Sequence, residues 1–365
     1  PTLSNGSRQT SIQNSIMAVP PGMGSAAIQT ALSDITVLDS YGRDFTGSVA
    51  ALIIKPGGSR PDGMRRRVAQ MGGGGQTDMG SGPVSAAIGF ASYRTGPRAT
   101  DVRSLVTTGT VSYQTGEFGV HAGFNAQDSL QLDTMGLAPF ADGVLAYTPQ
   151  AGNSLGIERR TRRGKVSVTI SGGGSHGSSA SAATLGWSTG GTTLRASFID
   201  ESGSVMGMPS RGALKLGRGA STTMIEAHQA FAIALGWSVE SYGSLGVTRL
   251  KIDDGSLVTG ASGIIGTRIG LQAKGPVLGG TLSFGVAQPL IIESGSAELT
   301  YGTGYDLQTR SLVHRTTEAS LAGERRLQLT AGFATGGHGS SFRVGVMQDV
   351  QQGATSALAG TAVRF

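Results

Sequence analysis

The stretch "RRLQLTAGFAT" (residues 325–335) alternates between two kinds of side chain from Leu327 onward. In an extended strand its two faces would carry, respectively, Leu327, Leu329, Ala331 and Phe333, and Gln328, Thr330 and Gly332. An alternation of period two is typical of a β-strand whose two faces meet different surroundings. This stretch therefore predicts a strand with one apolar face and one face of small or polar residues.

Period two continues through most of the chain after residue 84. It is present at 84–90, 118–124, 166–170 and 341–347, and most regularly in "FAIALGWSV" (231–239), which predicts one continuous strand. Turns rich in Gly, Ser and Asp separate the candidate strands, which number roughly twelve to fifteen. Many short alternating strands at this spacing predict an antiparallel sandwich or barrel.

The chemistry of the two faces favours a barrel turned inside out. Soluble barrels place large apolar side chains inside and charges outside, whereas membrane barrels have an apolar exterior and a small or polar lumen. Here the second face is Gly, Ala, Ser and Thr, with an occasional Arg, Asp or Gln. We therefore predict an all-β, antiparallel up-and-down β-barrel of about 12 strands over residues 84–365.

Composition excludes several classes of protein and site. The 365 residues include no cysteine, which excludes disulfides, thiolate metal sites and cysteine nucleophiles. Sixty glycines occur without a Gly-X-Y period, so the chain is not collagen-like. No run of about 18 apolar residues predicts a transmembrane helix. The strands of a membrane barrel alternate their faces and leave a much weaker hydropathy signal, so this observation does not exclude a membrane barrel.

Residues 1–83 differ from the rest and form the first of two predicted domains, with 84–365 as the second. Apolar residues at three- and four-residue steps predict a helix over about 24–40. Its apolar face would carry Ala27, Ile28, Ala31, Leu32, Ile35 and Leu38. The run Ile35-Thr36-Val37 also suits a strand, because β-branched residues favour extended backbone. Residues 55–83, rich in Gly, Pro and Arg, predict a linker.

Three stretches resemble the C-terminal translocator of autotransporters (type V secretion), specifically of subtilisin-like (S8) serine-protease autotransporters of alphaproteobacterial type. They are "ALSDITVLDSYGRDF" (31–45), "LSFGVAQPLIIESGSAELT" (282–300) and the terminal "TAVRF" (361–365). The resemblance implies a barrel in the outer membrane of a Gram-negative bacterium, which anchors and exports a passenger joined upstream. The passenger would carry any protease activity, so the chain itself is predicted not to be an enzyme.

The resemblance also implies roles for two segments. The helix near 24–40 would lie in the pore, where the N-terminal segment threads the barrel and tethers the passenger. Val363, Arg364 and Phe365 would form the signal read by the barrel-assembly machinery. The implied partners are outer-membrane lipid, that machinery and the passenger, with no cofactor. Aromatic residues form only 5% of the chain, fewer than the aromatic girdles of membrane barrels require.

No catalytic or metal-binding constellation is predicted. His176 and His338 lie in Gly/Ser-rich segments that superficially resemble the His-Gly segment of subtilisin-like proteases. The Asp and Ser segments of a triad are missing. The five histidines form no close pair, so no metal site is predicted.

Two alternatives remain open. The first is a non-catalytic barrel that is a structural or binding subunit of a larger complex and docks through basic loops. Its candidate loops are "MRRR" (64–67) and "ERRTRRGK" (158–165). No aromatic residues are interleaved with these arginines, so nucleic acid is not an expected partner. The second alternative is a residual enzyme that uses His176 or His338.

Overall fold

The computed structural model describes residues 1–54, 74–94, 102–124, 143–148, 152–175, 177–336 and 340–363. Fifteen strands form one sheet, in which every recorded pairing between neighbours is antiparallel. In chain order they are β7 (Gly74–Ser81), β8 (Val84–Arg94), β9 (Val102–Thr115), β10 (Phe118–Phe124), β11 (Asn153–Thr161), β12 (Gly164–Ser175), β13 (Ser178–Thr189), β14 (Thr192–Ser202), β17 (Gly219–Ala232), β18 (Ser238–Lys251), β20 (Ile264–Val277), β21 (Gly280–Ser294), β24 (Gln328–Gly336), β25 (Ser340–Asp349) and β26 (Ala354–Val363).

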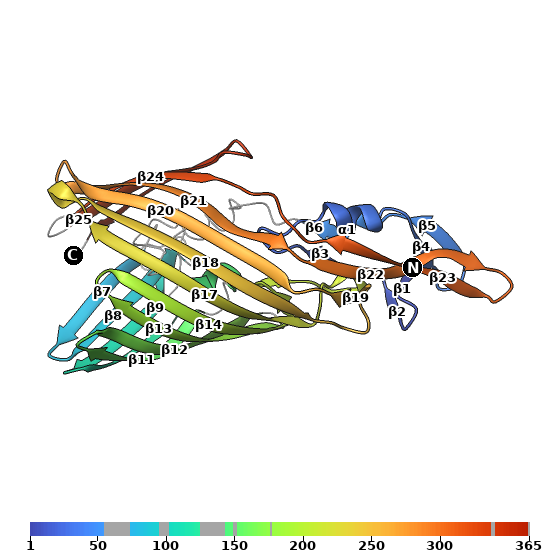
Figure 1. Ribbon diagram of the computed structural model, residues 1–365, viewed down its shortest axis with the longest axis horizontal. Coiled ribbons are helices and arrows are strands. Elements are labelled where there is room, and N and C mark those ends of the chain that lie inside the picture. The colour runs from blue at the N-terminus through green and yellow to red at the C-terminus, as the bar shows by residue number, and fades with distance from the viewer. Residues whose placement is uncertain are drawn as a thin grey trace.

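These strands make an up-and-down barrel, as the sequence predicts. Each barrel strand pairs with the barrel strands that precede and follow it along the chain. In Figure 1 the strands of the sheet follow one another downward from β20 through β18, β17 and β14 to β12 and β11. Within the described ranges, no pairing between the edge strands β7 and β26 is recorded. The predicted number of about 12 strands is too small, because hairpin turns of two residues leave little break in an alternating sequence.

The two ends of the barrel differ in their connections. At one end, which we call the short-turn end, hairpins turn at residues 82–83, 116–117, 162–163, 190–191 and 278–279. At the other, the long-connection end, segments 203–218, 252–263 and 295–327 join successive barrel strands. Barrel strands from β11 onward contain 9 to 15 residues each, which is enough for the roughly 9–11 residues of a tilted membrane-spanning strand.

A second body, here called the lobe, extends from the long-connection end (Figure 1). It consists of residues 1–54 with three strands from the long connections: β19 (Val258–Ala261), β22 (Ser296–Asp306) and β23 (Ser311–Ser320). Residues 1–54 contribute β1 (Thr2–Ser4), β2 (Gln9–Ser11), β3 (Met17–Ala18), α1 (Ala26–Ala31), β4 (Ile35–Leu38), β5 (Asp44–Gly47), η1 (Ala50–Leu52) and β6 (Ile53–Ile54). The sheet β2-β1-β4-β5 packs on the sheet β19-β22-β23, through contacts of β1 and β4 with β22.

The lobe therefore draws on both sides of the predicted 83/84 boundary. Strand β7 also begins ten residues before that boundary, inside the predicted linker 55–83. Its glycines do not prevent pairing, since β7 forms a regular antiparallel ladder with β8 from Gly74↔Ala91 to Ser81↔Val84. The rest of that linker, residues 55–73, lies outside the described ranges.

The predicted helix over 24–40 is only partly correct. Helix α1 covers Ala26–Ala31, whereas Ile35–Leu38 form strand β4. Strand β4 pairs with β5 from Ile35↔Gly47 to Leu38↔Asp44. The β-branched run Ile35-Thr36-Val37 thus follows its extended preference, and the sheet supplies the hydrogen bonds.

The predicted continuous strand at 231–239 is wrong, because the chain reverses there. Strand β17 ends at Ala232, a short 3-10 turn, η3, covers Ala234–Gly236, and β18 begins at Ser238. Leu235 and Gly236 have φ angles of 62° and 76°, in the left-handed region that turns require. Because the turn residues Ile233 and Leu235 are apolar, the apolar–polar alternation of the sequence continues through the turn. The alternation therefore does not reveal the hairpin.

Candidate functional site

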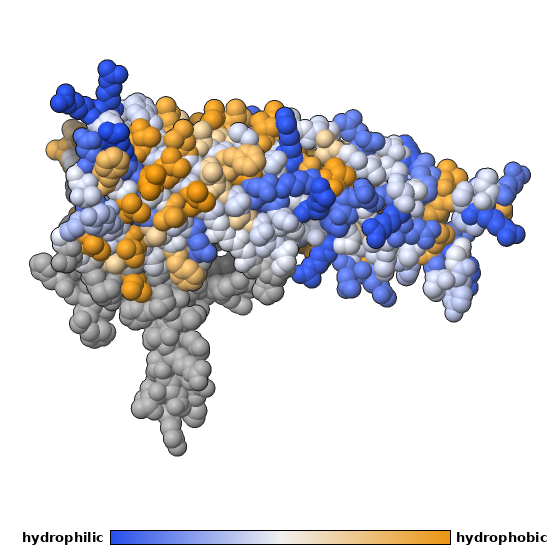
Figure 2. Space-filling view, turned by 90° about the horizontal axis from the view of Figure 1, so that it is seen from below, coloured by the Kyte–Doolittle hydropathy of each residue, from blue (hydrophilic) through white to orange (hydrophobic). Residues whose placement is uncertain are grey.

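The outward face of the barrel is an apolar band. Val166, Val168 and Ile170 of β12 are 39%, 42% and 62% exposed, which confirms the predicted facing. Their neighbours across the strands continue the same row, Val120, Ile157, Val168, Leu185, Ala196, Ile225 and Leu245. Figure 2 shows hydrophobic residues gathered over the strands, and hydrophilic residues where barrel and lobe meet. An extended exposed apolar surface of this kind is typical of contact with lipid.

The inward face is small and polar. Hydroxyl side chains on neighbouring strands hydrogen-bond across it, with Oγ–Oγ distances of 2.5 Å for Ser85–Ser112 and 2.8 Å for Thr184–Ser197. Gly156 faces the ring of His121, and an added Cβ there would lie 2.2 Å from its Nε2. A lining of hydroxyls and glycines can hold water, or a polar chain, inside a wall whose outside is apolar.

A ladder of charged side chains crosses the inward face of the sheet. Glu226 of β17 accepts from Arg195 of β14 at 3.0 Å and from Arg268 of β20 at 2.5 Å. Arg268 also donates to the Ser244 hydroxyl at 3.2 Å, and its guanidinium lies 4.7 Å from the ring centre of Tyr242. The Glu226 and Arg268 side chains are each 4% exposed. Burial makes this pairing obligatory, because an unpaired charge there would lose its hydration without compensation.

Two further ion pairs lie on the inward face. Glu158 accepts from Lys165 at 2.9 Å, and Glu240 pairs with Lys274. These pairs join residues of neighbouring strands near the short-turn end. The arrangement fixes paired charges in the wall.

The helix α4 (Gly143–Tyr147) places one ring against the inside of the wall. The Tyr147 hydroxyl donates to the Gly266 carbonyl at 2.8 Å, and the residue is 1% exposed. A Cβ on Gly246 would lie 2.5 Å from the Tyr147 oxygen, so only glycine leaves room for the ring. Gly246 and Gly266 face each other across β18 and β20 and together form the seat of this side chain.

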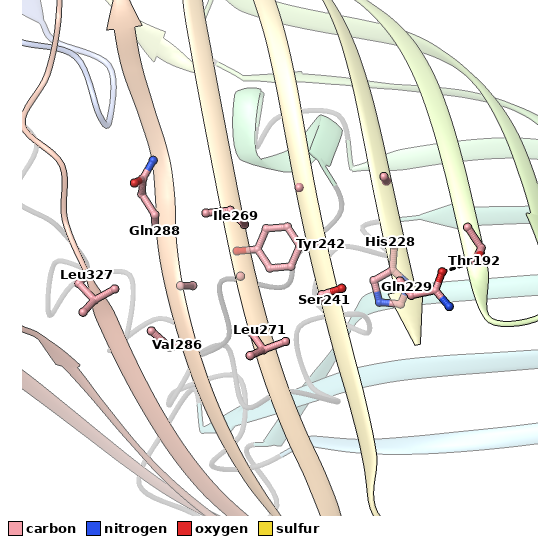
Figure 3. Close-up of a pocket in the computed structure, with 14 residues that line it drawn as sticks. Thr192, His228, Gln229, Ser241, Tyr242, Ile269, Leu271, Val286, Gln288 and Leu327 are labelled. Carbon is pink, nitrogen blue, oxygen red and sulfur yellow. Dashed lines mark hydrogen bonds between the residues drawn. The ribbon is translucent and has the colours of Figure 1, made fainter. Parts of the chain in front are cut away.

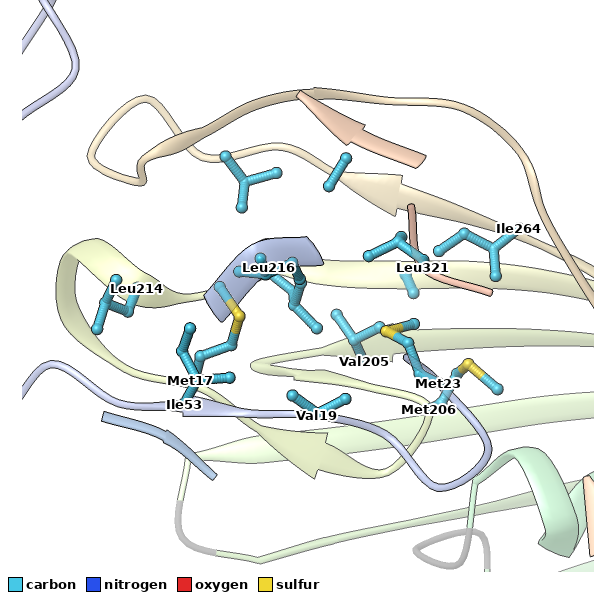
Figure 4. Close-up of a cluster of buried hydrophobic side chains, with 14 of the residues drawn as sticks. Met17, Val19, Met23, Ile53, Val205, Met206, Leu214, Leu216, Ile264 and Leu321 are labelled. Carbon is cyan, nitrogen blue, oxygen red and sulfur yellow. The ribbon is translucent and has the colours of Figure 1, made fainter. Parts of the chain in front are cut away.

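Beyond Tyr147, an apolar core fills the long-connection end on the side of β14, β17 and β20. Inward-facing Ile199, Met224 and Ile264 belong to one buried cluster with residues of the lobe and of segment 203–218. Figure 4 shows Met17 and Val19 of the N-terminal chain beside Val205 and Leu216 of that segment, and Ile264 beyond them. Along β17 the inward residues therefore pass from the apolar Met224 to the charged Glu226. The core closes this part of the mouth, and the charge ladder lies directly beneath it.

The lobe is fastened to the barrel by close backbone contacts next to an interruption in β21. The β20–β21 register shifts between Thr267 and Ile269, opposite the Gln288-Pro289-Leu290 segment. Proline, which has no N–H, is accommodated at such bulges. The β21–β24 ladder ends at Ala287, and beyond it Ile292 N donates to Gly22 O at 2.9 Å, while Ile292 stays paired with Gly266 of β20.

Two glycines of the N-terminal chain allow this approach. A Cβ on Gly22 (φ +78°) would lie 2.1 Å from the Leu290 carbonyl oxygen, and one on Gly24 would lie 2.0 Å from that of Ala322. Gly24 N donates to Leu321 O at 2.9 Å. We call Gly22, Gly24 and the backbone they contact the clasp.

Inside the lobe, the carboxylate of Asp253 joins the connection 252–263 to segment 203–218. It pairs with Lys215 at 2.9 Å and accepts from Gly255 N at 2.9 Å. Partial burial acts to raise the pKa of Asp253, but these hydrogen bonds outweigh it and hold the pKa below its ordinary value.

The predicted pore helix lies in the lobe. Ala27, Ile28 and Ala31 belong to α1, Leu32 follows it, and Ile35 and Leu38 belong to β4. Helix α1 packs against β23 and η1, and Ile28 and Leu32 are fully buried there. The six predicted residues thus do not share one helix face; they are buried or partly buried in the lobe, and their role in a pore stays a prediction.

The predicted assembly signal is described only in part. Val363 is the last residue of β26, whereas Arg364 and Phe365 lie outside the described ranges. Its role stays a prediction. The basic segment 158–165 forms the hairpin between β11 and β12 at the short-turn end, and residues 64–67 lie outside the described ranges.

The remaining histidine, metal and enzyme expectations are not tested. His176 and His338 lie outside the described ranges. In the part of the chain that the structure describes, no three His, Asp or Glu side chains gather as a metal site would need. None of the described helices is long and apolar enough to cross a membrane.

Sequence reasoning missed the charge ladder and Tyr147. Residues 225–228 alternate between apolar and polar, so placing Glu226 on the inward face was possible from its position between Ile225 and Ala227. Its partners were not identifiable, since Arg195 and Arg268 are 31 and 42 residues away along the chain. Which loop residue would enter the barrel could not be read from period two.

Comparison with known proteins gives only distant structural similarity. No protein-family model and no curated protein matches the sequence. Solved structures with similar folds include a porin refined at 1.8 Å resolution, at 13% identity and a TM-score of 0.41, covering 76% of this chain and 92% of the porin. An anion-selective porin from Comamonas acidovorans has 13% identity and a TM-score of 0.40, over 80% and 86% of the two chains. A mutant Rh. blastica porin has 11% identity and a TM-score of 0.36, over 80% and 88%. Similarities at these TM-scores are too distant to assign a function to this chain.

Proposed function

We propose that this chain is an outer-membrane β-barrel of a Gram-negative bacterium that holds its N-terminal lobe at the cell surface, as the translocator of an autotransporter would. The observation that carries the proposal is the two-faced wall. Adjacent strands expose a continuous apolar row outward, from Val120 to Leu245, while hydroxyls and paired charges line the inside. In water that row would favour aggregation, whereas in a bilayer it would contact the lipid chains.

The ends of the barrel give the proposal a direction. Outer-membrane barrels have short turns on the periplasmic side and longer loops outside. The short-turn end would then face the periplasm, together with the end of β26. The long connections and the lobe would lie outside, and a polypeptide joined to Pro1 would emerge there.

The partly filled mouth is consistent with an anchor after export. The core of Ile199, Met224 and Ile264, with Tyr147 seated on the wall, fills space that a passing chain would need. A passenger of the subtilisin-like type, suggested by the sequence resemblance, would use this barrel as its attachment to the membrane.

Single cysteines test the orientation, because the chain has no cysteine of its own. Tyr41 in the lobe is 84% exposed, and Leu278 in the β20–β21 turn is 93% exposed. We expect Tyr41→Cys to react with a membrane-impermeant maleimide on intact cells, and Leu278→Cys to react only after the outer membrane is permeabilised. Labelling of Leu278→Cys alone in intact cells would overturn the orientation. A chain that is recovered without detergent and shows no heat-modifiable migration would overturn the membrane assignment.

The polar inside favours a second candidate, a channel for small solutes. The two functions differ in the expected conductance of the chain in a planar bilayer. An anchor whose lumen is narrowed by Tyr147 and the neighbouring apolar core conducts weakly, and Tyr147→Gly should raise its conductance. A steady large conductance of the unaltered chain, with no change in Tyr147→Gly, would favour the channel and count against the anchor.

A further inference from the structure

The outer wall is hollowed where β17, β18, β20 and β21 run side by side. The hollow has a volume of about 680 Å³ and a mostly apolar lining, with Thr192, Gln229 and Ser241 along one side. Figure 3 shows Ile269 and Leu271 on one strand, Val286 and Gln288 on the next, and Leu327 beyond them. Ile269 and Leu271 are 61% and 47% exposed and lie in the apolar band. We call this hollow the wall groove.

Small side chains make the groove. Gly243 lies between Ala227 and Ile269 in the outward row. An added Cβ on Gly243 would meet only the Arg268 carbonyl oxygen, at 3.9 Å, so the space in front of it is open. Elsewhere the same band carries the larger side chains of Leu185, Ile225 and Leu245.

One end of the groove is charged. A second hollow of about 320 Å³ shares Gly243, Ile269 and Gln288 with the groove, and continues it toward the lobe. There Glu293 accepts from Thr267 at 2.7 Å and from Arg325 at 3.1 Å. The Arg325 side chain is 72% exposed. The register shift opposite Pro289 lies beside this end, where β20 and β21 lose their regular ladder.

We propose that the wall groove binds one acyl chain of a lipid with a phosphate headgroup, and that Arg325 contacts the phosphate. The inference rests on the proposed function, because the groove meets lipid only if the apolar band does. An acyl chain matches the mostly apolar lining in chemistry, and burying methylene groups against Ile269 and Leu271 favours binding.

The charge at the lobe end selects the headgroup. A guanidinium has five N–H donors in a planar fork. The recorded bond to Glu293 uses the Nη2 nitrogen of Arg325, and guanidinium groups bind phosphate in two-pronged geometry. The charged end lies toward the lobe, which is where the headgroup region of the outer leaflet would be if the lobe is outside. The long axis of the lipid would then follow the strands.

The test uses the full chain in nanodiscs of phosphatidylglycerol, with retained lipid counted by native mass spectrometry. Gly243→Leu fills the groove and should lower retention of phosphatidylglycerol about tenfold, the loss expected from exposing about two methylene groups. Ala196→Leu is the matched control, since Ala196 is an outward small residue of β14 outside the groove, and it should retain lipid like the unaltered chain.

Arg325→Gln separates the headgroup from the acyl chain. It should lower retention of phosphatidylglycerol about two- to fivefold, as expected for an exposed ion pair, and leave retention of diacylglycerol with the same chains unchanged. Soluble glycerol phosphate should not compete, because the proposal requires the acyl chain. Competition by glycerol phosphate would overturn it in favour of a free phosphate site.

The two proposals fail in different ways. If the unaltered chain does not insert, as judged by heat-modifiable migration, the membrane function fails and the lipid site fails with it. If all variants insert and Gly243→Leu retains as much lipid as Ala196→Leu, only the lipid site is overturned.

Discussion

The barrel wall and the lobe are built from similar residues but arranged in opposite ways. In the lobe, Leu3, Ile28 and Leu32 are almost completely buried, whereas the charged residues Arg8, Asp34 and Asp44 are exposed. In the wall, Ile157, Ile170 and Ile225 are each more than half exposed, while Glu226 and Arg268 are buried. The lobe is stabilised as a water-soluble domain is, by removing apolar surface from water. The wall reverses this arrangement and therefore requires lipid outside and complete polar pairing inside.

A substitution in the charge ladder should lower the free energy of unfolding most, because the ladder's charges are buried inside the barrel wall. Glu226→Ala leaves Arg268 buried and unpaired, which we expect to lower the free energy of unfolding by about 3–5 kcal/mol. Urea unfolding in detergent micelles measures it. The double variant Glu226→Met/Arg268→Met should recover much of the loss, and a double variant as unstable as Glu226→Ala would contradict the pairing argument.

A charge on the outward face should be nearly as damaging. Val168→Lys places an ammonium group in the apolar band and should cost about 2–4 kcal/mol near the bilayer midplane. Thr169→Lys, one residue along on the inward face, should be tolerated. Folding yield into lipid vesicles, read from heat-modifiable migration, compares the two. Equal yields would mean that the facing of β12 is wrong.

The clasp should decide whether lobe and barrel stay together. Gly22→Ala brings a Cβ into the Leu290 carbonyl and also strains a left-handed backbone, so we expect the lobe to detach and residues 1–54 to become sensitive to protease. Gly42→Ala has the same left-handed strain (φ +76°) but nothing within 4 Å of the added carbon. It should cost only about 1–2 kcal/mol and leave the lobe attached. Limited proteolysis that cleaves both variants alike would show that strain, not contact, controls the lobe.

The Tyr147 hydroxyl should contribute less. Tyr147→Phe keeps the ring between Gly246 and Gly266 and removes the hydrogen bond to the Gly266 carbonyl. We expect a loss of about 0.5–1.5 kcal/mol, measured by urea unfolding. A loss as large as that of Glu226→Ala would indicate that the hydroxyl, and not the ring, holds α4 in place.

The smallest effect is a pH dependence confined to the lobe. Because the pKa of Asp253 is lowered in the folded chain, its contribution is present above the ordinary carboxyl pKa and is lost as the pH falls toward the folded value. The lobe should become more sensitive to an acid-active protease as the pH falls through that window. Asp253→Asn should flatten this dependence, and an unchanged profile in the variant would exclude Asp253 as its source.

Particular residues show how far the sequence leads. Val166, Val168 and Ile170 face outward as their spacing predicts, because a strand cannot place successive side chains on one face. The same rule misled at 231–239, where Leu235 keeps the alternation but lies in a turn. A second rule, the three- and four-residue spacing of a helix face, failed for Ile35 and Leu38, which belong to β4. The periodicity of apolar residues indicates which side chains share surroundings within a segment. It does not show where the chain reverses.

Side-chain alternation is a local property of the backbone, so a sheet with one apolar and one small polar face could be predicted from the order of residues alone. Which distant residues meet could be seen only in the folded chain. Glu226 with Arg195 and Arg268, Tyr147 on its two glycines, and Gly22 against β21 all join segments far apart along the chain. Such contacts depend on how strands align and where loops return, and no local pattern of residues specifies either.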